Sequence, residues 1–246
     1  MATMRDWHNR WQLAVAQANS SADSLDEASK HATRDSTRQR LQHQRDAQRR
    51  YAQQLQKLLE PLALNNNANL ESFLALRTRL PTEQGLTSYA ANLFRDWCWG
   101  DAENATSLRA ISALLTDQRP GNVLVLGAGA GRLAYDAHQA LKPQATLALD
   151  NNPLFTSILT RVAAGESVQL IEFPLAPNKA EDTAIERTLA APSPAAPGFH
   201  CVLADGLRAP FLPGSFDLVI TPWFVDVVQA EPQEVVARIN HLLAVG

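Results

Sequence analysis

The residues best suited to chemistry lie at the ends of apolar runs in the second half of the chain. Three glycines at alternating positions, Gly127, Gly129 and Gly131, follow the apolar run at 123–126. Such a turn between a strand and a helix is typical of a nucleotide-binding α/β unit. Glycine suits it because the turn requires φ angles that side chains resist and because the backbone must approach a ligand closely. A purely structural turn is the alternative interpretation.

The spacing of these glycines separates two classes of ligand. A dinucleotide fingerprint, G-x-G-x-x-G/A, would need a small residue at position 132, where the chain has an arginine. The observed G-x-G-x-G pattern resembles the first motif of class I S-adenosylmethionine (SAM) methyltransferases. That resemblance implies SAM as the cofactor, contacted by Gly127, Ala128, Gly129, Gly131 and Arg132.

A carboxylate follows the second apolar run, at 146–149. Asp150 lies 23 positions after Gly127, near the spacing of about 20 that is typical of an acid binding ribose hydroxyls. A carboxylate can accept two hydrogen bonds from a cis-diol. If the predicted strand ends one residue later, Asn151 takes this role instead of Asp150. The alternative is that Asp150 starts a turn or caps the next helix.

Two further apolar runs, at 199–203 and 216–221, complete the pattern. The first ends near Asp205 and Gly206, where SAM enzymes often place an acid against the adenine amino group; a plain Asp-Gly turn is the alternative. The second ends at Thr221. Four strands with helical stretches after the first, second and fourth predict a parallel, doubly wound, Rossmann-like sheet. The glycine turn, both acids and Thr221 then meet where ligands of such sheets bind.

The chain from about residue 88 to 246 resembles the carnosine N-methyltransferase family, SAM-dependent enzymes that methylate an imidazole nitrogen. The likeness is carried by FRDW at 94–97, the glycine segment, a long insertion after the second strand, and Phe224-x-Asp226. It implies a substrate site formed by Asn178, Trp223, Phe224 and Asp226. Two departures, FPLAPNKAED at 173–182 and Thr221-Pro222-Trp223, fall where substrate would be recognised, so the resemblance favours the fold and cofactor more than carnosine.

The resemblance implies that Asp226 is the catalytic residue, acting through its carboxylate. A carboxylate that accepts the hydrogen of one imidazole nitrogen fixes the tautomer and raises the basicity of the other. A helix cap is the alternative for Asp226, and core packing is the alternative for Trp223 and Phe224.

Composition limits the other classes of function. The net charge of −3 gives no general electrostatic case for nucleic acid, and the six histidines are scattered, so we expect no metal site. Cys98 and Cys201 lack redox or metal spacing, which fits a reducing cytoplasm. No apolar run approaches the about 20 residues of a membrane helix. The expected partner is a small-molecule or short-peptide substrate, and a homodimer is compatible with the sequence.

Three segments organise the chain. We expect a helical extension over 1–86, a helical segment over 87–118, and the SAM-binding core over 119–246 with its last strands missing, as in a fragment. Arginines at 34, 38, 45 and 49 share a helix face, but interleaved aspartates favour a solvated face over an RNA-binding one. The alternatives to a small-molecule methyltransferase are a non-catalytic SAM-binding scaffold, an RNA or protein methyltransferase, and an NAD-linked oxidoreductase.

Overall fold

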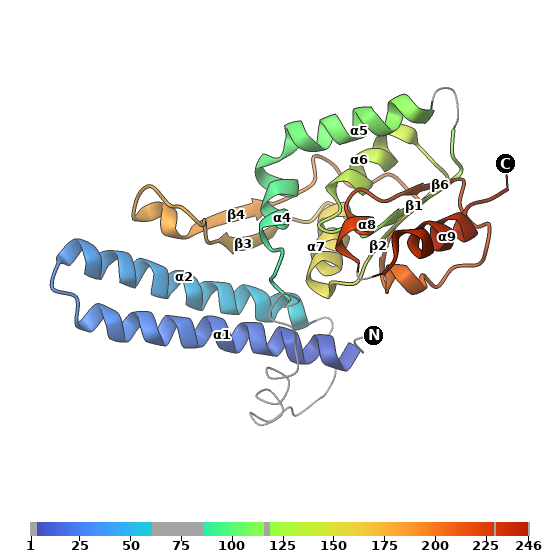
Figure 1. The fold of residues 1–246 in the computed structure, drawn as a ribbon. Helices are drawn as coiled ribbons and strands as arrows, with labels where there is room; N and C mark the ends of the chain where they lie inside the picture. Colours follow the sequence, from blue (N-terminus) through green and yellow to red (C-terminus); the bar gives the residue numbers. More distant parts are fainter. Residues whose placement is uncertain (1–3, 61–85, 116–118, 229, 246) are drawn as a thin grey trace. The chain divides into compact units, whose positions relative to one another are not determined.

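The computed structural model describes residues 4–60, 86–115, 119–228 and 230–245. The chain divides into two compact units (Figure 1), one formed by Met1–Ala91 with Gln169–Thr188 and the other by Asn92–Val168 with Leu189–Gly246. The division differs from the three consecutive segments expected from sequence, because residues 169–188 group with the amino-terminal helices and not with the rest of 119–246.

The second unit contains a four-stranded parallel sheet. Its strands are β1 (Asn122–Leu126), β2 (Ala145–Asp150), β5 (Phe199–Leu203) and β6 (Leu218–Ile220). They are ordered β5-β2-β1-β6, and every neighbouring pair is parallel. The predicted α/β class and parallel sheet are confirmed, and the arrangement is compatible with a Rossmann-like fold. The fourth strand is shorter than the predicted run at 216–221.

Helices cover both faces of this sheet. In Figure 1, α6 (Arg132–Leu141) and α7 (Pro153–Ala163) lie on one side and α9 (Pro232–Leu242) lies on the other. Alternate side chains of a strand point to opposite faces. Leu124 and Leu126 accordingly share a core cluster with Val235 and Leu242 of α9, and the intervening Val125 is also buried.

A helical segment precedes β1. It comprises α4 (Ala91–Phe94), a π-helical turn at Arg95–Trp99 and α5 (Asp101–Leu115). The π turn closes with the Gly100 N–H donating to the carbonyl oxygen of Arg95 at 2.6 Å. A Cβ at Gly100 would overlap that same oxygen, so this ending needs glycine.

The carboxyl-terminal residues run beside the start of β6. Leu243 forms a parallel bridge with Phe216. The Phe216 N–H donates to Leu242 O at 3.1 Å, and the Ala244 N–H donates to Phe216 O at 2.8 Å. These bonds place Leu243 and Ala244 beside Phe216, just before β6. The turn into a fifth strand predicted at 244–246 stays a prediction, as do the further strands.

The other unit pairs two long helices with a small sheet. Its elements are α1 (Met4–Lys30), α2 (Asp35–Leu59), β3 (Val168–Glu172) and β4 (Ile185–Leu189). The two strands pair with each other and were not predicted within the long insertion. Tyr51 of α2 packs edge-on against Phe173, with ring centroids 5.5 Å apart. A helix predicted near residues 70–80 lies outside the described residues.

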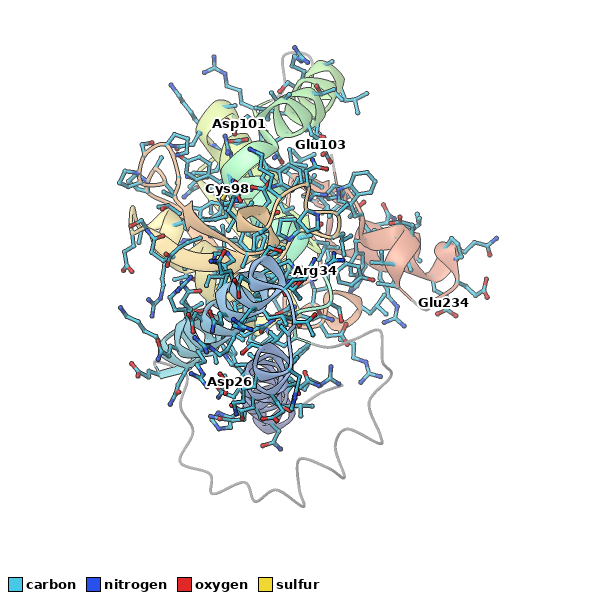
Figure 2. All side chains as sticks on the ribbon, turned by 90° about the vertical axis from the view of Figure 1, so that its left-hand side faces the viewer. Asp26, Arg34, Cys98, Asp101, Glu103 and Glu234 are labelled. Atoms are coloured by element: carbon cyan, nitrogen blue, oxygen red, sulfur yellow. The ribbon has the colours of Figure 1, made fainter. Side chains whose placement is uncertain are left out.

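Ion pairs neutralise part of the arginine face of α2. Arg38 pairs with Asp35 at 2.8 Å, and Arg45 pairs with Asp26 of α1, also at 2.8 Å (Figure 2 labels Asp26). Arg49 and Asp23 are 3.8 Å apart. These carboxylates reduce the positive potential of the face. In the described part of the chain, no helix is long and apolar enough to cross a membrane.

Candidate functional site

The glycine turn after β1 leaves one open position. Gly127, Gly129 and Gly131 have φ values of +63°, +58° and +87°, in the left-handed region that favours glycine. A Cβ at Gly127 would approach the ring of Phe224 at 3.0 Å, and one at Gly131 would overlap the side chain of Leu159. A Cβ at Gly129 would meet nothing within 4 Å. Gly129 is therefore the position where a ligand can approach the backbone.

Asp150 ties the end of β2 to this open position. Its Oδ2 accepts a hydrogen bond from the Gly129 N–H at 2.8 Å, and its Oδ1 accepts one from the Asn152 N–H at 2.8 Å. Burial raises the pKa of Asp150 above its ordinary value, while the N–H groups of Asn152, Gly129 and Asn151 act to lower it. Each carboxylate oxygen has two lone pairs, so capacity remains for a ribose hydroxyl. Asn151 itself is exposed.

Asp205 and Gly206 stand at the neighbouring strand end, just after β5. The Oδ1 atom of Asp205 accepts from the Leu207 N–H at 2.9 Å and caps η4, the short 3-10 turn at Gly206–Arg208. Its Oδ2 has no hydrogen-bonding partner among the described residues, so it remains able to accept from a ligand. A Cβ at Gly206 would come within 2.6 Å of the Phe224 ring. That ring therefore fills the space between Gly127 and Gly206.

The residues after β6 differ widely in exposure. Thr221 is partly buried, and Phe224 is 7% exposed. Trp223 is 58% exposed, and Asp226 is exposed on the single-turn helix α8 (Phe224–Val227). The structure thus places the aromatic ring of Phe224 against Gly127 and Gly206 and leaves Trp223 and Asp226 exposed.

Asn178, the remaining predicted substrate residue, lies in the connection between β3 and β4. It is exposed, and it belongs to the unit that contains α1 and α2.

The π-helical turn before α5 supports the glycine turn. The indole N–H of Trp97 donates to the carbonyl oxygen of Ala130 at 2.9 Å, and Trp97 is 5% exposed. Ala130 lies between Gly129 and Gly131, so this bond restrains the backbone of the turn at its centre. π turns inside helices occur frequently at functional sites.

A buried carboxylate, Asp96, reaches the start of α6. Its Oδ2 accepts from the backbone N–H of Arg132 at 3.4 Å, and its Oδ1 accepts from the Nε–H of Arg95 at 3.0 Å. Burial raises the pKa of Asp96, while Arg95 acts to lower it. The negative charge at the amino end of α6 is thus supplied by the protein itself.

The side chain of Arg132 is committed to carboxylates. Its Nε–H lies 3.0 Å from each oxygen of Asp136, and its Nη1 donates to Asp101 at 2.8 Å. Asp101 projects from the first turn of α5, as Figure 2 shows. The guanidinium also lies 5.5 Å from the centroid of the Trp97 ring. Both the guanidinium and the backbone N–H of Arg132 therefore bond to groups of the protein, and a cofactor contact by Arg132 stays a prediction.

Sequence reasoning gave Trp97 no role beyond the FRDW segment that carried the family resemblance. For Arg95 and Asp96 it left two roles open, pairing with each other or closing over SAM, and the pairing is confirmed. The partners of Asp96 and Trp97 in the glycine turn lie 36 and 33 residues further along the chain. No local pattern reports a contact over that distance.

No family model matches this chain, and no curated protein matches it. Among the residues that the structure describes, no group of three His, Cys, Asp or Glu side chains is placed to hold a metal ion. The case for a function therefore depends on the geometry of the glycine turn and the carboxylates around it.

Proposed function

We propose that the chain binds SAM at the carboxyl ends of β1, β2 and β5 and transfers its methyl group to a nitrogen of a small imidazole or amine compound. The observation that carries this proposal is the open backbone position at Gly129, held 2.8 Å from the Asp150 carboxylate. In this arrangement the glycine turn contacts the methionine part of SAM. Asp150 accepts from the ribose hydroxyls, and the unpaired oxygen of Asp205 accepts from the adenine amino group.

The charges around the turn favour SAM over a dinucleotide. SAM carries positive charge on its sulfonium and its amino group, whereas NAD carries a negative pyrophosphate. A dinucleotide enzyme places that pyrophosphate at the amino end of the helix after the turn. Here Asp96, which is paired with Arg95, already occupies that end of α6 and accepts the Arg132 N–H at 3.4 Å. A backbone donor that would bind a phosphate is therefore already engaged.

The residues present fit SAM, which when bound supplies an electrophilic methyl group. The chain's part is to hold acceptor and donor in line, and such positioning can contribute about 7–11 kcal/mol. Asp226 accepts the N–H of a substrate imidazole, so the second nitrogen keeps its lone pair for the methyl group. Trp223 offers an exposed aromatic face beside it for stacking.

A second candidate is a protein that binds SAM without turnover. The exposure of Trp223 and Asp226 favours it, because an enzyme usually encloses the reacting groups away from water. An RNA methyltransferase has less support, since carboxylates lie at 2.8 Å from both Arg38 and Arg45.

Two measurements test the proposal. Calorimetry with SAM and with NADH should give binding of SAM alone; binding of NADH alone would overturn the cofactor assignment. Labelled SAM should then be incubated with carnosine, other imidazole peptides, amines and RNA. Labelled imidazole product supports the enzyme, and SAM binding with no labelled product supports the second candidate.

Membership of the carnosine N-methyltransferase family and a cytoplasmic location stay predictions.

A further inference from the structure

A groove of about 530 Å³ separates η4 from α9, the orange and red elements in Figure 1. This volume falls within the about 300–1,000 Å³ that is usual for small-molecule sites. Its walls are largely apolar and come from Leu207, Ala209, Phe211, Ala237 and Leu242. An aliphatic chain or an aromatic ring would lose contact with water there.

Three basic side chains line the same groove: Arg208, Arg238 and His241. The Nη1 atom of Arg238 donates to the carbonyl oxygen of Leu207 at 2.6 Å, so its guanidinium is held across the groove. Neither Arg208 nor His241 forms an ion pair with any described residue.

α9 contains one acidic residue, Glu234, in its first turn. It lies four residues before Arg238 and so on the same helix face, but it does not line the groove and forms no ion pair with any described residue. None of the residues that line the groove is acidic. The lining therefore combines apolar side chains with two arginines, and it contains no carboxylate that would neutralise them.

We propose that this groove binds a small carboxylate with an apolar body, such as a medium-chain or aryl-substituted acid. The guanidinium of arginine presents its N–H donors in a fork that matches the two oxygens of a carboxylate. The apolar body covers Phe211 and Leu242, and the carboxylate faces Arg208 and Arg238. Gly206 lines the groove and also belongs to the proposed cofactor edge, so the two sites adjoin. No other lining residue is assigned to SAM or to the methyl acceptor, so binding here is a function beyond the proposed transfer.

Octanoate is the probe, with octanol and octylamine as ligands of matched length. Titration followed by NMR or calorimetry should show octanoate binding more tightly than either. Replacing one arginine, in Arg208→Gln or Arg238→Gln, should weaken octanoate binding about tenfold. The matched control is Arg109→Gln on α5, which removes an exposed arginine outside the groove and should leave binding unchanged.

A second variant tests the shape of the groove without changing charge. Ala237 is exposed on α9 and lines the groove. Ala237→Phe should therefore fill the groove and weaken octanoate binding while the helix stays folded by circular dichroism. Equal affinity for octanoate and octanol, or unchanged octanoate affinity in all groove variants, would overturn the proposal. Binding of an acidic peptide without any binding of octanoate would overturn it as well. SAM calorimetry on the same variants tests the cofactor site independently.

Discussion

The indole nitrogen of Trp97 lies 2.9 Å from the carbonyl oxygen of Ala130 and donates its hydrogen to it. This bond joins a π-helical turn to the centre of a glycine turn that is 33 residues away in sequence. Because both groups are buried, neither can exchange the bond for one to water. The shape of the glycine turn, the proposed cofactor site, therefore depends on a segment that precedes the sheet.

Trp97→Phe tests this dependence. Phenylalanine keeps most of the packing but leaves the Ala130 carbonyl oxygen without its donor, which should lower the free energy of unfolding by about 1–3 kcal/mol. The affinity for SAM should fall as well, because the glycine turn loses a restraint. Urea denaturation and calorimetry measure the two effects. Trp99→Phe is the control: Trp99 lies in the same π turn but is 54% exposed. Equal effects in both variants would contradict a specific role for Trp97.

The second and third glycines of the turn, Gly129 and Gly131, predict different defects when replaced by alanine. Gly129→Ala and Gly131→Ala both force alanine into a left-handed conformation, at about 1–2 kcal/mol each. At Gly131 the new methyl also overlaps the side chain of buried Leu159, whereas at Gly129 it enters open space. Gly131→Ala should therefore have the lower melting temperature. Gly129→Ala should keep more stability yet lose more SAM affinity, since its methyl occupies the proposed ligand position.

Asp150→Asn should weaken SAM binding by about tenfold or more, because an amide offers only one acceptor oxygen and no charge to the ribose hydroxyls. Calorimetry measures SAM affinity in this variant and in the control Glu234→Gln. Glu234 is an exposed carboxylate on α9 that Figure 2 labels, so the control removes one negative charge outside the site. Wild-type affinity in Asp150→Asn would remove Asp150 from the site.

The raised pKa of Asp150 gives stability a defined dependence on pH. In the folded chain burial raises this pKa above the ordinary 3.8, which we take for the unfolded chain. Between pH 3.8 and the raised pKa of the folded chain, the folded chain binds more protons at Asp150 than the unfolded chain does. The contribution of Asp150 to stability therefore falls as the pH rises through that window. It is most favourable below 3.8. Unfolding free energies of wild type minus Asp150→Asn, measured from about pH 3 to 7, should therefore decline with pH and then level off. An increase with pH would contradict the assigned direction.

The four strands of the parallel sheet were predictable because each is a short apolar run, and β1 and β2 are closed by a glycine and an acid. Asp150 and Gly129 fall at such closures, and their proximity follows from parallel strands ending at one edge. The contact of Asp96 with the Arg132 N–H and the position of the Phe224 ring between Gly127 and Gly206 were not predictable. Both depend on side chains from distant segments meeting across the turn, and neither leaves a periodic signal. The strands β3 and β4 were missed because their sequences show little alternation of apolar and polar residues.

Asp226 separates the enzyme from a SAM-binding protein without turnover. It stands on α8 next to the ring that contacts Gly127, but its own side chain is exposed. Asp226→Asn should leave SAM affinity unchanged, because no cofactor contact is assigned to it. If the substrate is an imidazole, kcat should fall by about tenfold or more, since an amide can present its N–H₂ group to the ring and no longer fixes the reactive tautomer. Asp226→Glu should restore part of the rate, whereas Glu231→Gln, a nearby exposed change, should not affect it. An unchanged kcat in Asp226→Asn would mean that the acceptor is held elsewhere, because an exposed carboxylate that binds substrate cannot be neutralised without changing the rate.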